Sequence, residues 1–218
     1  MLVEFWDFCR PNSMRTLPYV KAWHERYEAA GLRVIGVHCP GFECSRDEQA
    51  VRDAVARLHI EYPVLIDSEL EVWQDYENQG WPARYLFDGR ARLFEYHFGE
   101  GAYTETELAI QELLKLEREP LAPLRPEDAS SAALAPQTQD QQGAYLGPYE
   151  AGAVWAVLDG EGRVTVNGGE ARGGRELIVA HPGAYPLLEH ARHTSGVIEL
   201  ELGAEVRCLA TCFTPGLA

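Results

Sequence analysis

The segment from residue 4 to residue 20 combines the residue types of a thiol-based active site. An apolar, β-rich run ends at Cys9, Arg10 follows, and a helix-forming stretch with an early proline begins directly afterwards. A thiol at the start of a helix feels the positive end of the helix dipole, and a neighbouring guanidinium adds a fixed positive charge. The sequence therefore predicts Cys9 as a nucleophilic thiol and Arg10 as the group that stabilises its thiolate. The alternative is that Cys9 is a buried structural residue.

Two more cysteines follow the next apolar run. Cys39 and Cys44 flank the tetrapeptide PGFE, directly after the strand-like stretch RVIGVH. In an α/β sheet this strand ends at the same edge as the first, so either thiol is a candidate to resolve a disulfide formed on Cys9. The alternative for both is an unreactive core or loop residue. Cys208 and Cys212 are predicted to fill the core, because on a strand their Cα atoms would lie roughly 13 Å apart, beyond disulfide reach.

The C-terminal third contains two weaker candidate sites. One is a possible metal site at His181, Glu189, His190 and His193. These residues show neither an H-x-H nor an H-E-x-x-H pattern, and the segment reads as a turn between strands, so we predict no metal site and no cofactor. The other is a sugar-stacking pair, Trp155 and Tyr185, for which the simpler interpretation is a place in the core.

Length, composition and charge limit the function further. The chain has 218 residues, 46% of them apolar, which predicts two domains with real cores. The formal net charge is −15 and no basic run is present, so a nucleic-acid partner is not expected. No stretch reaches the roughly 18 apolar residues of a membrane span, and the N-terminus lacks a leader pattern. Five cysteines, an odd and sparse set, predict a cytoplasmic protein. An anchor or leader upstream of Met1 stays open, and the sequence indicates no oligomeric state.

The candidate thiols lie in an alternation of strand and helix signals that covers residues 1–118 and predicts an α/β domain. Helical spacing runs from Met14 to Tyr27, and Gly31 is expected to close that helix. Ser45 is expected to cap the next helix, with Glu48 completing a capping box. Residues 119–143 carry four prolines and many small or polar residues, which predicts a linker. Residues 144–218 read as short strands between glycine-rich turns and predict a small all-β, sandwich-like domain.

Several motifs in the right order resemble a known family. LVEFWDF, RTLPYVKAW, GLRVIGVH, WPARYLFD and FGEGAYTETELAIQELL resemble the thioredoxin-like domain of DipZ-type proteins, within the TlpA/ResA and AhpC-TSA-like redoxin group. The resemblance covers roughly residues 2–117. The ending CLATCFTPG resembles, more weakly, the carbohydrate-binding-module-like tail that follows the same domain. The resemblance implies a thioredoxin-like fold and thiol–disulfide exchange with a protein or a small thiol or disulfide as substrate.

The sequence departs from this family at the redox motif. With Trp6 and RTLP as anchors, the two cysteines of the family's C-x-x-C would fall at Arg10 and Ser13, and a shift to Cys9 places Asn12 at the second position. The pair is therefore expected to be lost. The resemblance also implies a cis-proline loop at Trp81–Pro82 that faces the active site, and a substrate-binding role for Trp6, Ser13, Trp81 and Pro82.

Two functional hypotheses follow. The first is an atypical thiol–disulfide oxidoreductase, or a thiol-dependent antioxidant protein, that uses the single cysteine Cys9 and a resolving thiol from elsewhere. The second is a redox-inactive interaction module that binds a partner through the thioredoxin-like groove and the β domain. Cys9, Arg10 and Pro82 favour the first hypothesis, and the missing C-x-x-C favours the second.

Overall fold

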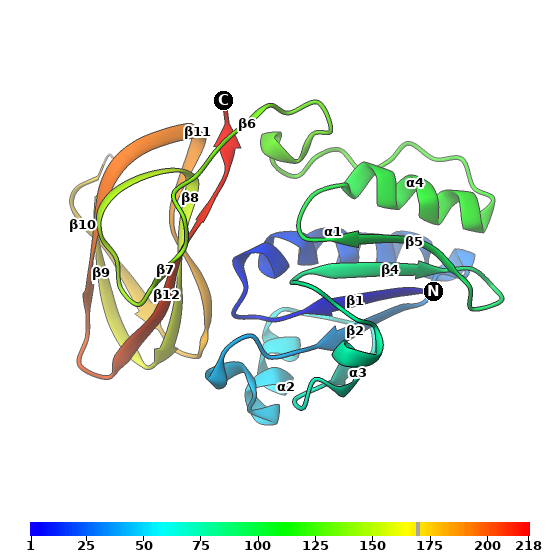
Figure 1. Ribbon diagram of the computed structural model, residues 1–218, viewed down its shortest axis with the longest axis horizontal. Helices are drawn as coiled ribbons and strands as arrows, with labels where there is room; N and C mark the ends of the chain where they lie inside the picture. The colour runs from blue at the N-terminus through cyan, green and yellow to red at the C-terminus, as the bar shows by residue number, and fades with distance from the viewer. Residues whose placement is uncertain (169–170) are drawn as a thin grey trace. The chain divides into compact units, whose positions relative to one another are not determined.

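A computed structural model describes residues 1–168 and 171–218 of the chain (Figure 1). The described residues form two compact units, Met1–Leu124 and Arg125–Ala218. Both units have the fold class that the sequence predicts. The first alternates strands with helices, and the second consists mainly of strands.

The first unit is organised around a five-stranded sheet with the order β3-β2-β1-β4-β5. Strands β1, β2 and β3 are parallel, β4 runs antiparallel to β1, and β5 runs antiparallel to β4. Their bounds are β1 Leu2–Trp6, β2 Val34–His38, β3 Val64–Ile66, β4 Ala83–Phe87 and β5 Leu93–Phe98. Since β1 and β2 are parallel neighbours, the loops that follow them leave the same edge of the sheet. This relationship brings the segments of Cys9 and Cys44 together.

Four helices and two short 3-10 turns connect these strands. They are α1 Pro11–Tyr27, η1 Glu28–Ala30, η2 Glu43–Ser45, α2 Glu48–Arg57, α3 Glu71–Asp75 and α4 Tyr103–Leu114. Helix α1 begins with Pro11 at its first position, where the missing N–H costs no hydrogen bond, and Gly31 ends the following turn at φ 108°. The expected cap at Ser45 is wrong, because Asp47 is the N-cap of α2 and accepts the N–H of Ala50.

The two faces of β1 carry different cores, as the two-residue period of a strand requires. Val3 and Phe5 pack with Val37, Ala83 and Tyr85 into an apolar cluster. Trp73 of α3 and Tyr76, which follows the helix, pack against it. The opposite face holds Leu2, Glu4 and Trp6, all fully buried. Arg84 of β4 lies over the rings of Trp23 and Tyr103, which belong to α1 and α4.

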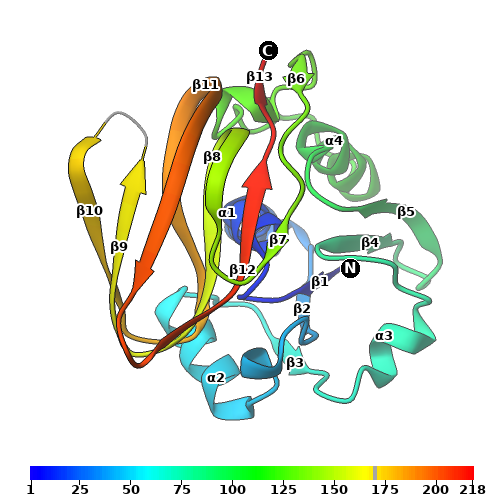
Figure 2. The same cartoon turned by 60° about the vertical axis from the view of Figure 1, so that its left-hand side comes forward.

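The second unit is all-β, and its main sheet has six antiparallel strands in the order β10-β9-β11-β8-β12-β7. A separate pair joins β6 and β13. The bounds are β6 Leu134–Ala135, β7 Gln141–Gln142, β8 Leu146–Gly160, β9 Gly162–Gly168, β10 Ala171–Val179, β11 Gly183–Leu202, β12 Val206–Thr214 and β13 Gly216–Leu217. The long strands β8 and β11 bend strongly along their length (Figure 2). Register shifts in their pairing, between Pro186 and Leu188 and between Glu189 and Thr194, supply the irregularity that lets a strand bend.

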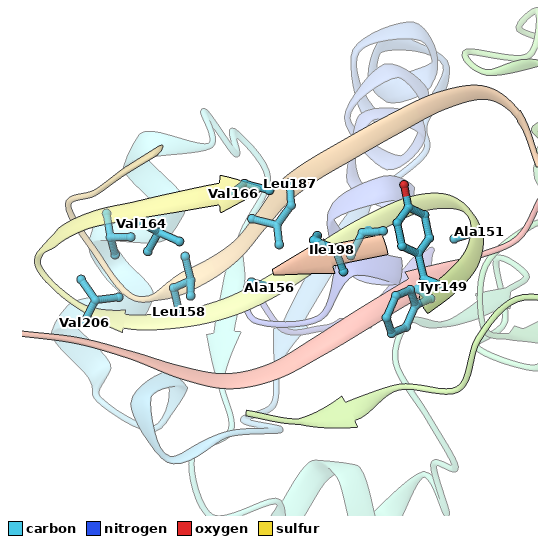
Figure 3. Packing of buried hydrophobic residues seen from close by; sticks show 12 residues of the cluster. Tyr149, Ala151, Ala156, Leu158, Val164, Val166, Leu187, Ile198 and Val206 are labelled. Carbon is cyan, nitrogen blue, oxygen red and sulfur yellow. The ribbon is translucent and has the colours of Figure 1, made fainter. Parts of the chain in front are cut away.

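The core of the second unit lies inside the curve of this sheet. Figure 3 shows side chains from several strands pointing toward one another, among them Leu158, Val164, Leu187 and Ile198. Small and β-branched residues dominate this cluster, which suits the tight inner face of a curved sheet. The turn expected for the segment of Glu189, His190 and His193 is wrong, because these residues lie within β11, at its register shift.

The segment expected to be a linker, residues 119–143, carries short elements of its own. Leu121 and Leu124 donate backbone hydrogen bonds to Glu107 and Tyr19 of the first unit. From Arg125 onward the chain belongs to the second unit, which contains η3 Pro126–Asp128, β6 and β7. The division between the units therefore falls inside the predicted linker, after Leu124.

Candidate functional site

The loops after β1 and β2 bring two thiols together. The Sγ atoms of Cys9 and Cys44 lie 3.6 Å apart, although the residues are 35 positions apart in the chain. Cys9 lies in the turn before α1, and Cys44 lies in η2. All five cysteines are in the described part of the chain and are thiols. A disulfide needs a sulfur–sulfur distance of about 2.05 Å, so the two sulfur atoms are in contact but not bonded.

The two thiols differ in their access to solvent. Cys9 is fully buried, whereas Cys44 is half-buried. The hydrogen bond to Cys44, burial and the negative charge of Asp7 together raise the pKa of the Cys9 thiol above its ordinary value. This result corrects the sequence-based expectation of a thiolate at Cys9. The helix start and Arg10 are both present, but burial and a nearby carboxylate oppose them.

Arg10 holds the two loops and the cis-proline loop together instead of facing Cys9. Its guanidinium lies 4.6 Å from the ring centroids of both Phe42 and Trp81. Its Nη2 donates a hydrogen bond to the carbonyl of Gly41 at 3.2 Å. A Cβ at Gly41 would meet Arg10 Nε at 2.5 Å, so the guanidinium packs directly on the glycine. Arg10 is therefore part of a stacked cover beside the thiols.

Asp7, which the sequence reasoning did not consider, is the polar centre of the site. Its carboxyl group is fully buried, accepts the Cys9 N–H at Oδ1 (2.9 Å), and accepts the Gly41 N–H (2.8 Å) and the Ser45 hydroxyl (3.2 Å) at Oδ2. His38 Nε2 lies 3.5 Å from Oδ1, and its ring stacks on Phe8. A signal for this residue was available, since an aspartate inside the apolar run EFWDFC must find partners when buried.

Cys39 is separated from this chemistry by its own partners. Its Sγ donates to Asp67 Oδ2 at 3.3 Å, and its carbonyl accepts the indole N–H of Trp81 at 2.9 Å. Asp67 also accepts the backbone N–H groups of Val72 and Trp73 at the start of α3. Burial and Asp67 raise the pKa of the Cys39 thiol. Of the two candidate resolving thiols, the structure places Cys44, rather than Cys39, against Cys9.

The four predicted substrate-binding residues lie in different environments. Trp6 is fully buried against His38, and Ser13 is fully buried with its Oγ accepting the N–H of Asp7 at 3.3 Å. A substrate-binding role for these two residues is therefore wrong, because no external group reaches them. The Trp81–Pro82 peptide bond is cis, Pro82 is buried, and Trp81 is half-buried under Arg10.

The weaker candidates lie in the second unit. Tyr149 pairs with His190, and Tyr185 pairs with His181, all within the second unit. Trp155 is 8% exposed, which favours the core interpretation. Among residues 1–168 and 171–218 no group of three or more His, Cys, Asp or Glu side chains could hold a metal ion. Within the same residues, no helix has both the length and the apolar composition needed to span a bilayer.

Comparison with known proteins identifies the group to which this chain is similar. A scan against protein-family models finds no match. Protein DipZ of Mycobacterium bovis is 32% identical over 184 residues, which cover 79% of this chain and 26% of DipZ. The thiol-disulfide oxidoreductase YkuV of Bacillus subtilis is 26% identical over 113 residues, 52% of this chain and 76% of YkuV. This chain belongs to the thioredoxin-like redoxin group. It spans about a quarter of the length of the DipZ proteins it matches.

Solved structures in the comparison include a secreted Mycobacterium tuberculosis disulfide oxidoreductase. It covers 51% of this chain and 80% of its own, with 16% identity and a TM-score of 0.43. The cytoplasmic location predicted from the sequence is wrong, because homologues such as DipZ point to a non-cytoplasmic location. The cysteine count, on which the prediction relied, does not separate a redoxin of one compartment from a redoxin of another.

Proposed function

We propose that this chain is a thiol–disulfide oxidoreductase whose redox pair is Cys9 and Cys44. The observation that carries the proposal is the 3.6 Å distance between the two sulfur atoms, which come from adjacent loops at one edge of the sheet. The relatives support a thioredoxin-like redox role in general. In this proposal Arg10 and Ser13 occupy the positions of the family's two cysteines. The dithiol is formed instead by Cys9, in the loop after β1, and Cys44, in the loop after β2.

The difference in burial assigns a role to each thiol. Cys44 is half-buried and meets the external disulfide, whereas Cys9 is fully buried and reacts only with Cys44. This order reverses the sequence-based expectation, in which Cys9 attacks first. The substrate is a disulfide of a protein or of a small molecule.

The chemistry balances in two exchange steps. The Cys44 thiolate attacks one sulfur of the external disulfide, forms a mixed disulfide and releases the first thiolate, which takes up a proton. Cys9 then loses its proton and attacks Cys44 Sγ, and the second external sulfur leaves as a thiol. Two protein thiols are oxidised to one disulfide while one external disulfide is reduced to two thiols. The reverse sequence oxidises an external dithiol.

Site-resolved oxidation tests the proposal. The full chain is incubated with oxidised glutathione, free thiols are alkylated, and the linked peptides are identified by mass spectrometry. We expect a Cys9–Cys44 disulfide in the wild type and a glutathione adduct on Cys44 in Cys9→Ser. Cys39→Ser is the matched control, because its hydroxyl can still donate to Asp67, and it should oxidise like the wild type. A first adduct on Cys9, or a disulfide to Cys39, would contradict the assignment.

The second candidate function is a redox-inactive interaction module. The observations in its favour are the complete burial and raised pKa of Cys9, which make one of the two thiols a poor nucleophile. A chain that stays folded and fully reduced after prolonged exposure to oxidised glutathione would favour this function over the oxidoreductase.

A further inference from the structure

We infer that Asp7 is the positioning residue that holds the Cys44 turn against Cys9. This inference rests on the proposed function and names a residue that the redox pair needs but that does not itself exchange electrons.

The first oxygen of Asp7 fixes the Cys9 loop. Oδ1 accepts the backbone N–H of Cys9 at 2.9 Å, and the N–H of Asp7 itself donates to Ser13 Oγ on the first turns of α1. The side chains of Asp7 and Ser13 are fully buried, so water does not compete for these hydrogen bonds. The position of Cys9 is thereby tied to the carboxyl group two residues before it.

The second oxygen fixes the turn that carries Cys44. Oδ2 accepts the Gly41 N–H at 2.8 Å and the Ser45 hydroxyl at 3.2 Å. Gly41 lies before η2 and Ser45 is its last residue, so Oδ2 contacts the chain on both sides of Cys44. One buried carboxyl group therefore determines where both loops lie, and with them the distance between the two sulfur atoms.

A carboxylate suits this task and an amide does not. Both carboxylate oxygens accept hydrogen bonds, whereas an asparagine has one acceptor oxygen and one NH2 donor. In Asp7→Asn the NH2 group faces either the Cys9 N–H or the Gly41 N–H, and two donors repel. The substitution therefore releases one loop or the other while keeping the size of the side chain.

The readout is the equilibrium between the Cys9–Cys44 disulfide and a glutathione buffer of known composition, measured on the full chain. This equilibrium reports the effective concentration of the two thiols, which a loss of stability alone does not change. We expect Asp7→Asn to lower the equilibrium constant at least about tenfold, as loss of a buried hydrogen bond to a charged group implies. Ser45→Ala removes one contact of the carboxyl group, together with the hydrogen bonds of the hydroxyl to Cys9 and to the Phe42 backbone, and should lower the constant by a smaller factor.

Asp67→Asn is the matched control. Asp67 is also buried and accepts two backbone N–H groups and one thiol, but it contacts neither Cys9 nor the Cys44 turn. Its variant should keep the wild-type equilibrium constant within about twofold, while losing a similar set of hydrogen bonds. Circular dichroism and urea midpoints show whether each variant is folded, and Ser45→Ala carries the test if Asp7→Asn does not fold.

The outcomes separate the two proposals. If the wild type forms the disulfide and both Asp7→Asn and Ser45→Ala keep the wild-type constant, the positioning role of Asp7 is wrong and the redox pair stands. If Asp67→Asn lowers the constant as much as Asp7→Asn, the effect does not depend on the contacts of Asp7 with the two loops, and the inference is again wrong. If the wild type forms no Cys9–Cys44 disulfide, the proposed function fails, and the role of Asp7 fails with it.

Discussion

The backbone N–H of Cys9 donates to Asp7 Oδ1 at 2.9 Å, and the charge of the same carboxyl group adds to the hydrogen bond with Cys44 and to burial in raising the pKa of the Cys9 thiol. The group that holds Cys9 in place thus also favours its protonated form. A thiol in this position is well placed for reaction with one neighbour and poorly suited to attack a substrate from solution.

Alkylation should distinguish the two thiols of the site. With iodoacetamide at pH 7 we expect Cys44 to react at least about tenfold faster than Cys9, because Cys44 is half-buried and Cys9 is fully buried with a raised pKa. The alkylation rate at Cys9 should still increase with pH above about 8.5, which is the reference pKa of a thiol, because the pKa of Cys9 is raised. Mass spectrometry over a time course measures both rates. Equal rates in the folded protein would contradict the burial assigned to Cys9, and denaturant should equalise them.

The buried Glu4 should make stability fall with rising pH. Burial raises the pKa of Glu4 from 4.5 to about 8, while Arg84 and the hydroxyl of Tyr62 act in the opposite direction. The folded state therefore holds a proton that the unfolded state has lost, so the free energy of unfolding should decrease between about pH 4.5 and about pH 8. The slope from this group is at most about 1.4 kcal/mol per pH unit.

Glu4→Gln tests this assignment. The amide mimics the protonated acid, so urea midpoints should match the wild type at the lower end of the window and exceed it at the upper end. A wild type and variant with parallel pH profiles would show that Glu4 does not retain its proton on folding.

Arg10 and Gly41 should be energetically coupled. Gly41→Ala places a Cβ at 2.5 Å from Arg10 Nε and 2.7 Å from Nη2, which displaces the guanidinium from Phe42 and Trp81. In an Arg10→Ala background the same substitution meets no guanidinium. A double-mutant cycle from urea unfolding should give a coupling energy of about 1 kcal/mol or more. Additive effects would mean that the stack does not constrain the loop.

Limited proteolysis should cut the chain inside residues 129–133. This stretch, ASSAA, lies between η3 and β6, and its residues are exposed or half-buried. The flanking parts of the expected linker are held, since Leu124 N–H bonds to Tyr19 and β7 pairs with β12. Elastase, which cleaves after small residues, should give two products of defined size. Early cuts between residues 136 and 143 would instead support a linker without structure over its whole length.

The sequence predicted the positions of the loops better than their chemistry. Parallel β1 and β2 could be expected from two apolar runs separated by a helix, and this order brings Cys9 and Cys44 to one edge. The pKa of Cys9 could not be expected, because it depends on Asp7 and on burial, which are set by contacts between distant loops. The continuity of β11 was missed for a different reason: its polar middle, HARHTS, has the composition of a turn but pairs in register on both sides of a bulge.

Strands β1 and β2 also determine how much chain lies between the two thiols. A C-x-x-C motif closes a loop of a few residues, whereas a bond from Cys9 to Cys44 closes one of 35 residues. In the chain-entropy model, closing such a loop restricts the unfolded chain enough to stabilise the fold by about 4 kcal/mol. Oxidation of this pair would therefore raise the melting temperature of the protein. The melting temperature would then depend on the redox potential of the surroundings.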